Sequence, residues 1–148
     1  MKILIVEDNQ KKLEKIKGYL EKEFPDVDLE QKTSYNSAAK EIALNYDQYN
    51  LILLDMSMQT YDISNDESGG EPEPLAGKNI LKQIYLREIP TKVIVVTMYE
   101  NFIDGTKIDQ LHQELKEGFS ENYCGFIFFS HTNLDWSLKL KQFIKELT

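Results

Sequence analysis

Four short runs of apolar residues recur along the chain, and they limit the folds that it can adopt. The runs are residues 3–6, 51–54, 93–96 and 126–129. Each holds four consecutive aliphatic or aromatic side chains, which is typical of a strand that is buried on both faces of a sheet. Between the runs, apolar residues recur every three or four positions, as on one face of an amphipathic helix. The chain is therefore expected to alternate strands with helices.

A fifth strand is predicted at residues 27–30, where apolar and acidic residues alternate as on a half-exposed edge strand. Each predicted strand is followed by a helical pattern. The helices are expected to begin near Asn9, near Ser34 or Asn36, after Gly77, near Asp104 and near Trp136. This alternation predicts an α/β fold, flavodoxin-like and doubly wound, (βα)5, with a five-stranded parallel sheet of order 2-1-3-4-5. Residues 1–148 are expected to form a single domain.

The charge balance excludes several classes of partner. The chain of 148 residues has 17 basic and 25 acidic side chains, which gives a net charge of −8. Nucleic acids and anionic membranes bind basic surfaces, so neither is expected as a direct partner. The single cysteine, Cys124, excludes an internal disulfide, and no apolar run is long enough to span a membrane. These features predict a cytoplasmic protein.

One acidic segment interrupts the alternation of strands and helices. Residues 62–74 hold five acidic and no basic side chains, together with two of the four prolines. Such a composition cannot pack a core, so we expect a loop insertion at the surface. The segment follows the strand that ends at Asp55. A passive loop and an element that binds a partner or autoinhibits the site are both consistent with it.

Acidic residues follow two strands that are expected to be neighbours. Glu7 and Asp8 come directly after the first strand, and Asp55 comes directly after the third. In open parallel sheets the functional crevice lies at the carboxyl ends of the strands. Carboxylates that meet there need a cation, and Mg²⁺ prefers oxygen ligands of this kind. Thr97 ends the next strand, and its hydroxyl can donate a hydrogen bond to an oxyanion in the same crevice.

These motifs resemble the receiver (response regulator) domain of two-component signalling. The resemblance rests on ILIVED, LILLDMSM, VIVVT and the closing pattern GFIFF…TNLDWSLKLKQFIKEL, and it covers essentially the whole chain. It implies that Asp55 is the phosphoacceptor and that Thr97 contacts the phosphoryl group. It also implies a Mg²⁺ site formed by Glu7, Asp8, Asp55 and the backbone carbonyl of Ser57.

The resemblance further implies how the domain signals. Thr97 and Phe126 match the pair of residues that switch conformation after phosphorylation. The phosphoryl donor would be a sensor histidine kinase, a phosphotransfer protein or a small phosphodonor. The fourth helix, fifth strand and fifth helix would form the surface for a homodimer or for a downstream protein, here unknown. Such a protein is not an enzyme in the usual sense, because it modifies only itself and at most dephosphorylates itself.

The sequence departs from the family pattern at one position that bears on the chemistry. Receivers carry a lysine late in the fifth strand, and this lysine forms an ion pair with the phosphoryl group. Here the position falls on Phe129, or on Ser130 if the alignment slips by one residue. Lys78 and Lys92 are the conceivable substitutes. The missing lysine favours an alternative function, namely a phosphorylation-independent pseudo-receiver that acts as an interaction module.

Three simpler interpretations and one enzymatic alternative are also open. Asp8 could serve only as the N-cap of the first helix, Asp55 could be a structural turn residue, and Thr97 could be a satisfied strand-end hydroxyl. A phosphohydrolase of the haloacid dehalogenase type also uses an aspartate at the end of a strand. That family requires a second aspartate where this chain has Ser57, and it requires the motif on the first strand.

Overall fold

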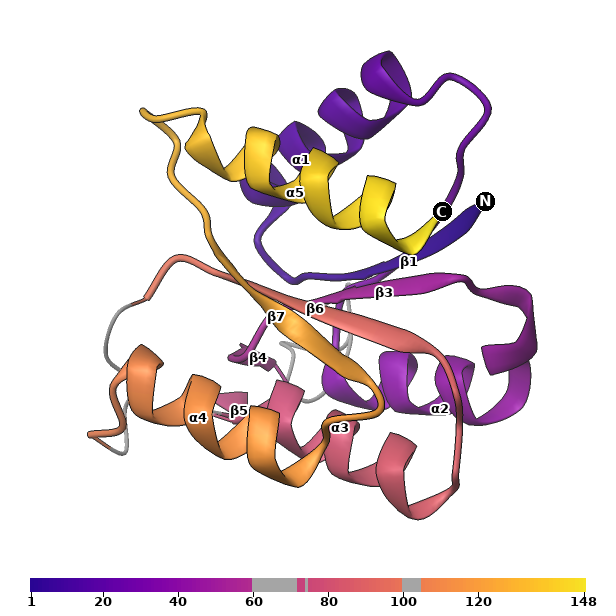
Figure 1. The fold of residues 1–148 in the computed structure, drawn as a ribbon, viewed down its shortest axis with the longest axis vertical. Helices are drawn as coiled ribbons and strands as arrows, with labels where there is room; N and C mark the ends of the chain where they lie inside the picture. The colour runs from indigo at the N-terminus through magenta and orange to yellow at the C-terminus, as the bar shows by residue number, and fades with distance from the viewer. Residues whose placement is uncertain (60–71, 74, 100–104) are drawn as a thin grey trace, which may run out of the picture.

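The computed structural model describes residues 1–59, 72–73, 75–99 and 105–148. Of the predicted loop at residues 62–74, only residues 72 and 73 are described. Asp104, near which the fourth helix was expected to begin, also lies outside the described residues. Five parallel strands form one sheet in the order β2-β1-β3-β6-β7, which is the predicted order 2-1-3-4-5 (Figure 1). The strands are β1 (Lys2–Val6), β2 (Asp28–Lys32), β3 (Leu51–Leu54), β6 (Lys92–Thr97) and β7 (Tyr123–Phe128).

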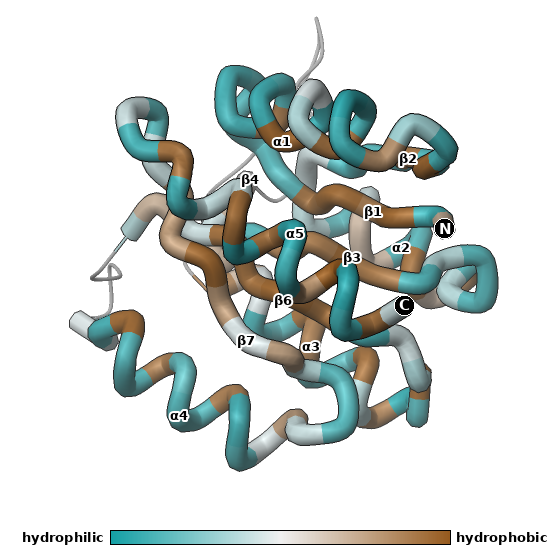
Figure 2. The backbone as a smooth tube through the Cα atoms, turned by 45° about the horizontal axis from the view of Figure 1, so that its top comes forward, coloured by the Kyte–Doolittle hydropathy of each residue, from teal (hydrophilic) through white to brown (hydrophobic). Residues whose placement is uncertain are grey.

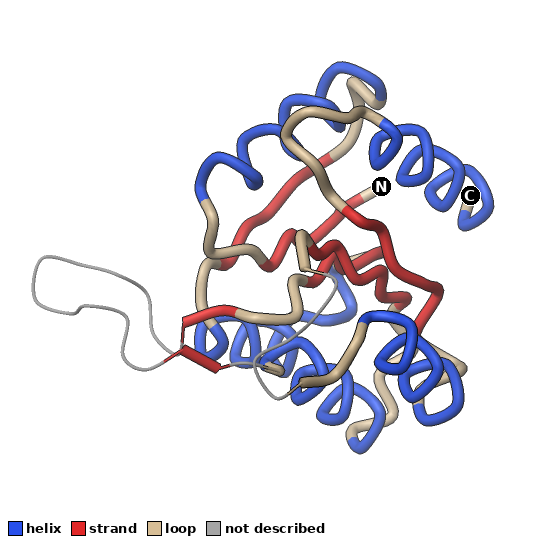
Figure 3. The backbone as a smooth tube through the Cα atoms, turned by 90° about the vertical axis from the view of Figure 1, so that its left-hand side faces the viewer, coloured by secondary structure: helices blue, strands red, loops and turns tan. Residues whose placement is uncertain are grey.

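Helices cover both faces of this sheet (Figures 1 and 3). Two of them, α1 (Gln10–Glu23) and α5 (Asp135–Leu147), lie on one face. The other face is covered by α2 (Tyr35–Asn45), α3 (Ala76–Leu86) and α4 (Ile108–Gly118). A short 3-10 helix, η1 (Tyr46–Gln48), follows α2. The predicted doubly wound arrangement is therefore confirmed.

Alternate side chains of the central strands enter two separate cores. In β3, Leu51 and Leu53 pack toward α1 and α5, whereas Ile52 and Leu54 pack toward α2 and α3. All four are buried, because each face of the strand is covered by helices. Figure 2 shows the result as hydrophobic strands inside a shell of more hydrophilic helices. The unbroken apolar runs of the sequence follow directly from this double cover.

The bounds of the last strand differ from the prediction. The last strand begins at Tyr123 rather than at residue 126 and ends at Phe128, one residue before the predicted end. A register shift against β6 occurs next to Gly125, whose φ of 149° is accessible to glycine. A Cβ at Gly125 would lie 2.8 Å from the ring of Phe143, so the glycine also admits that ring. Gly125, which interrupts the apolar run, hid the strand character of the residues before 126.

A second sheet was not predicted from the sequence. Two short antiparallel strands, β4 (Met58–Gln59) before the acidic segment and β5 (Pro72–Glu73) near its end, pair with each other. They follow Asp55 along the chain and precede α3. Among the described residues, no helix is both long enough and apolar enough to cross a membrane.

Candidate functional site

The sheet register brings the strand-terminal acidic residues together. Val6 of β1 lies opposite Leu54 of β3, and Leu54 lies opposite Val95 of β6. The residues that follow these positions therefore meet at the carboxyl edge of the sheet. Carboxylate oxygens of Glu7, Asp8 and Asp55 all lie within 4.8 Å of one another. The sequence-predicted acidic cluster is thus present in the structure.

The cluster is largely sealed from solvent. Glu7 is 2% exposed and Asp55 is 4% exposed, while Asp8 is intermediate. Burial, together with the negative charge of Asp55, raises the pKa of Glu7 to about 8, although Lys12 opposes the shift. Like charges held this close, away from water, favour either protonation or the arrival of a cation.

Asn9, not Asp8, caps the first helix. Its side chain accepts a hydrogen bond from the backbone N–H of Lys12 at 3.0 Å, and its own N–H donates to Oε2 of Glu7 at 3.2 Å. The interpretation of Asp8 as only an N-cap is therefore wrong. Because Asn9 begins the helix, Asp8 remains in the connecting loop and faces the other two carboxylates.

A buried lysine completes the site, and sequence reasoning missed it. Lys12 lies in the first turn of α1 and is 1% exposed. Its Nζ contacts Oε1 of Glu7 at 2.5 Å and Oδ1 of Asp55 at 3.4 Å, and it donates a hydrogen bond to the carbonyl of Val96 at 2.7 Å. Burial lowers the pKa of Lys12, but Asp55 and Glu7 outweigh that effect and leave it above its ordinary value. The side chain is therefore a fixed positive charge.

The sequence did contain a signal for this lysine. Lys12, Ile16 and Leu20 recur at helical spacing and are all buried on the inner face of α1. Lys12 is thus the first residue of the buried face of α1, and a charged side chain can be buried there only if it is paired. The stripe begins just after the acidic pair, so its first member points toward the acids.

The two lysines named as conceivable substitutes, which no sequence signal supported, both have other partners in the structure. Lys78 forms an exposed ion pair with Glu114 at 3.1 Å. Lys92 donates a hydrogen bond to the backbone carbonyl of Glu121. Lys92 begins β6, so it lies at the amino edge of the sheet, opposite the carboxylates.

Of the two residues aligned with the missing family lysine, Phe129 lies beside the site. Its backbone N–H donates to the carbonyl of Thr97 at 2.8 Å, and its ring is buried against Trp136. The Lys12 Nζ lies 5.9 Å from the centroid of this ring. Ser130 instead accepts hydrogen bonds from the backbone of Thr132 and Asn133, within its own loop.

The backbone around Asp55 is held by the start of α3. The N–H of Met56 donates to the Asp55 carboxylate at 2.8 Å, and the N–H of Gly77 donates to the carbonyl of Met56 at 3.0 Å. A Cβ at Gly77 would come within 2.6 Å of the carbonyl oxygen of Asp55. Only glycine permits this close approach, so Gly77 fixes the position of the chain after β3. Ser57, in the same turn, is half-buried.

The remaining predicted residues lie along β6 and β7. Thr97 is fully buried, and its Oγ1 accepts a hydrogen bond from the backbone N–H of Tyr99 at 3.1 Å. Phe126 is half-buried; its ring lies 5.1 Å from that of His112, and the Nζ of Lys139 lies 4.7 Å from its centroid. The hydroxyl of Thr97 thus has a hydrogen-bond partner in the backbone. Phe126, on β7, lies between a side chain of α4 and a side chain of α5.

The residues present fit a hard divalent cation. Three carboxylates with oxygens within 4.8 Å offer the ligand type that Mg²⁺ prefers, and Lys12 neutralises only part of their charge. Burial and then the nearby charge of Asp55 keep the pKa of Glu7 raised even with Lys12 in contact. Glu7, Asp8 and Asp55 would hold such an ion.

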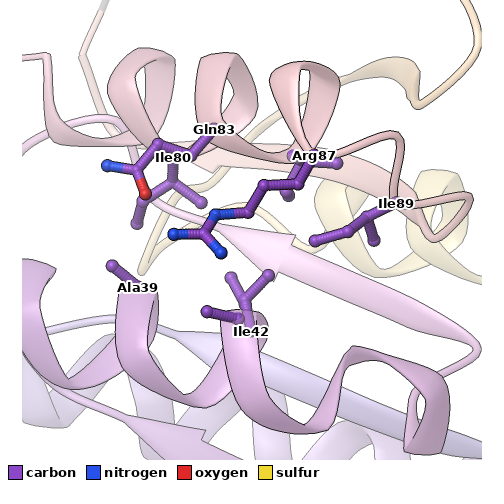
Figure 4. A pocket seen from close by; sticks show the side chains of 8 residues that line it. Ala39, Ile42, Ile80, Gln83, Arg87 and Ile89 are labelled. Carbon is purple, nitrogen blue, oxygen red and sulfur yellow. The ribbon is translucent and has the colours of Figure 1, made fainter.

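A second concave feature has no connection with this chemistry. A pocket between α2 and α3 is lined mainly by Ala39, Ile42, Ile80 and Ile89, and the side chain of Arg87 lies across it (Figure 4). Arg87 follows the end of α3, at the amino edge of the sheet. The pocket is therefore on the opposite side from the carboxylates.

Comparison with known proteins identifies relatives along the whole chain. No protein-family model matches. The chain is 32% identical to the uncharacterized protein y4jR of Sinorhizobium fredii (strain NBRC 101917 / NGR234), covering 95% of each chain. It is 30% identical to the Detocs response regulatory protein DtcB of Enterobacter cloacae (strain JD6301), covering 99% of this chain and 100% of that protein.

Solved structures share the fold. The CheY-like receiver domain protein of Methanospirillum hungatei JF-1 superimposes with a TM-score of 0.62 at 20% identity, covering 99% of this chain and 94% of that one. The Mn²⁺-bound form of response regulator Rcp1 gives a TM-score of 0.62 at 20% identity, covering 97% and 91%. With the full-length similarity to a response regulatory protein and the sheet order described above, the chain belongs to the response regulator receiver family.

Proposed function

We propose that this receiver domain accepts a phosphoryl group on Asp55 in a Mg²⁺-dependent reaction and signals through protein–protein contacts. The observation that carries the proposal is the convergence of Glu7, Asp8 and Asp55 at the carboxyl edge of the sheet. Thr97, at the end of the neighbouring strand β6, is the hydroxyl residue proposed to contact the phosphoryl group. We also propose that residues 1–148 form one domain.

The proposed step is an in-line transfer. An oxygen of the Asp55 carboxylate attacks phosphorus, the new O–P bond forms, and the bond to the donor breaks with its electron pair leaving on the donor. Bound Mg²⁺ would neutralise charge on the phosphoryl oxygens as the group is transferred. Glu7, Asp8, Asp55 and the carbonyl of Ser57 would hold the ion. The hydrogen bond from Met56 to the Asp55 carboxylate fixes the orientation of the attacking group.

The proposed partners follow from the family. A sensor histidine kinase or a phosphotransfer protein would present a phosphohistidine at the carboxyl edge of the sheet. Output would pass through α4, β7 and α5, where Phe126 is half-buried between His112 and Lys139. The name of the Enterobacter cloacae relative, a response regulatory protein, agrees with a signalling role.

The test is the intact mass of the protein after incubation with Mg²⁺ and a small phosphodonor. A gain of one phosphoryl group is expected for the wild-type chain, and none is expected for Asp55→Ala or when Mg²⁺ is chelated. The same measurement on a chain with residues 62–74 shortened separates exclusion of the donor by this segment from an inactive acceptor. No gain in either chain would contradict the proposal.

A phosphorylation-independent interaction module is the second candidate, and Phe129 at the family lysine position is the observation that favours it. Its signature would be binding of a protein partner that Asp55→Asn does not change. Lys12 weighs against it, because the site retains a buried positive charge in contact with Asp55. The haloacid dehalogenase alternative would require turnover of a generic aryl phosphate.

A further inference from the structure

Lys12 joins the ends of three strands. Its ammonium group has three N–H donors, and three acceptors surround it: Glu7 after β1, Asp55 after β3 and the carbonyl of Val96 near the end of β6. The distances are 2.5, 3.4 and 2.7 Å in that order. Two of the three contacts are short, whereas the contact with Asp55 is the longest. The ammonium is therefore firmly attached to β1 and β6 and loosely attached to the acceptor carboxylate.

A lysine at position 12 lowers the stability of helix α1. The first turn of α1 has no acidic residue, and Lys12 is a buried cation at the positive end of the helix dipole. A buried ion pair is also weak support for stability compared with apolar packing of similar volume. Helix stability therefore gives no reason for a lysine here, whereas the chemistry at Asp55 does.

Phosphorylation would change what Lys12 faces. Once an oxygen of Asp55 is bonded to phosphorus, the carboxyl group carries no charge of its own. The phosphoryl group brings roughly −1.5 to −2 charges into the same buried place. Among the described residues, Lys12 is the one basic side chain in ion-pair contact with Asp55. Because its contact with the Asp55 carboxylate is the longest of the three, the Lys12 ammonium can exchange that contact for one with a phosphoryl oxygen and keep its contacts with Glu7 and Val96.

Phe129 explains how a helix can supply this charge. The ring fills the space beyond β7, packed against Trp136 and buried to 1% exposure. Lys12 extends from α1 to within 5.9 Å of the ring centroid, so the aromatic side chain forms an apolar wall beside the ammonium. A charge beside such a wall is poorly screened, which strengthens its attraction for a nearby anion.

We propose that Lys12 is the cation that pairs with the phosphoryl group on Asp55, so that α1 supplies the charge for which β7 has no residue. This inference rests on the proposed phosphorylation of Asp55. It assigns Lys12 a direct contact with the transferred group, rather than a purely structural role of compensating the two buried carboxylates.

The test compares four proteins: wild type, Lys12→Met, Lys11→Met, and Lys12→Met combined with Phe129→Lys. Lys11 is the exposed neighbour of Lys12 on α1 and serves as the matched control. The double variant moves the charge to the position beside Thr97. Two quantities are measured: the rate of phosphoryl gain at saturating Mg²⁺ by intact mass, and the Mg²⁺ dissociation constant by fluorescence of Trp136, the single tryptophan.

Lys12→Met is expected to slow phosphoryl gain by about tenfold to a hundredfold, as when a charged transition-state contact is removed. It is also expected to bind Mg²⁺ more tightly, because a positive charge has left the carboxylates. Lys11→Met should stay within about twofold of wild type on both measurements, because exposed charges contribute little. The double variant should recover part of the lost rate.

Two results would overturn the inference. One is a wild-type rate in Lys12→Met at saturating Mg²⁺, whatever its Mg²⁺ affinity, and the other is an equal loss of rate in Lys12→Met and Lys11→Met. If the wild-type chain gains no phosphoryl group, the proposed function itself fails, and the inference fails with it. If circular dichroism shows that Lys12→Met does not fold, Lys12→Gln replaces it, because the amide keeps N–H donors without the charge.

Discussion

The Nζ of Lys12 lies 5.9 Å from the centroid of the Phe129 ring, so a cation from α1 meets an aromatic residue from the end of β7. Their positions are the reverse of what the family pattern predicts. The position of the family lysine, at the end of β7, holds Phe129, and the buried face of α1, where an apolar residue is expected, holds Lys12. The ring is also part of the core, in contact with Trp136 at a centroid distance of 4.9 Å.

The losses of stability caused by replacing Lys12 and by replacing Glu7 should not add, because the two side chains are paired. At pH 9, above the pKa of Glu7 of about 8, Lys12→Met leaves two buried carboxylates without their cation, which is expected to lower the free energy of unfolding by about 3–5 kcal/mol. Adding Glu7→Gln removes one stranded charge, so the double variant should lose less than the sum of the two single losses. Urea unfolding of the three variants measures this coupling. Lys141→Met, which breaks the exposed pair with Glu23, is the control and should change stability little. Additive losses would contradict the pairing.

Gly77→Ala should disturb the turn after Asp55. The added methyl group would lie 2.6 Å from the Asp55 carbonyl and 2.8 Å from Cε of Met56, and the backbone contact cannot be relieved by rotating a side chain. The expected cost in free energy of unfolding is about 1–3 kcal/mol. In contrast, Gly18→Ala on the exposed side of α1 meets nothing within 4 Å and should stabilise the protein by about 0.5–1 kcal/mol. Thermal unfolding of both variants makes the comparison, and similar effects in the two would refute this role for Gly77.

Binding of Mg²⁺ should stabilise the folded chain. A ligand that binds only the folded state at about a hundred times its dissociation constant raises the free energy of unfolding by about 2.7 kcal/mol. Asp8→Asn removes one of the three clustered carboxylates and should weaken this stabilisation, because the amide carries no charge. Asp28→Asn, an exposed site at the amino edge of the sheet, should leave it unchanged. Melting temperatures with and without Mg²⁺ decide the matter. Equal stabilisation of wild type, Asp8→Asn and Asp28→Asn would show that the ion does not bind at the clustered carboxylates.

His112 should make stability fall as the pH drops. Burial lowers the pKa of His112, the charges of Lys116 and Lys139 lower it further, and Asp109 opposes them. Its Nδ1 lies within hydrogen-bond distance, 2.6 Å, of the hydroxyl of Tyr123, whose pKa is raised by burial.

Because the folded pKa of His112 lies below the unfolded value of about 6.5, the unfolded chain takes up a proton first as the pH falls. This contribution to stability is complete above that pH and is lost below it. Urea midpoints between pH 7.5 and 5 should therefore decline less in His112→Gln than in wild type. Parallel curves would show that the imidazole does not titrate differently in the two states.

The sequence by itself determined the layers of this fold and the location of its acidic cluster. Runs such as residues 51–54 can be buried only if both faces of the strand are covered, which requires helices on both sides. Because parallel strands place their carboxyl ends at one edge, the order of the strands along the chain is enough to predict that Glu7, Asp8 and Asp55 meet. These inferences depend on local pattern and on chain direction, which a sequence records directly.

Only the tertiary structure decided that Lys12 is the basic side chain paired with that cluster, and that Asn9 rather than Asp8 caps α1. Lys12 and Asp55 are far apart along the chain, and their contact depends on how the inner face of α1 is rotated against the sheet, a rotation fixed by the Asn9 cap and by packing of Ile16 and Leu20. The residue opposite Lys12, Phe129, comes from the far end of the chain. Helical periodicity specifies a buried stripe, but the partner of each buried residue is set by the packing of separate elements, and for a buried charge that partner determines its chemistry.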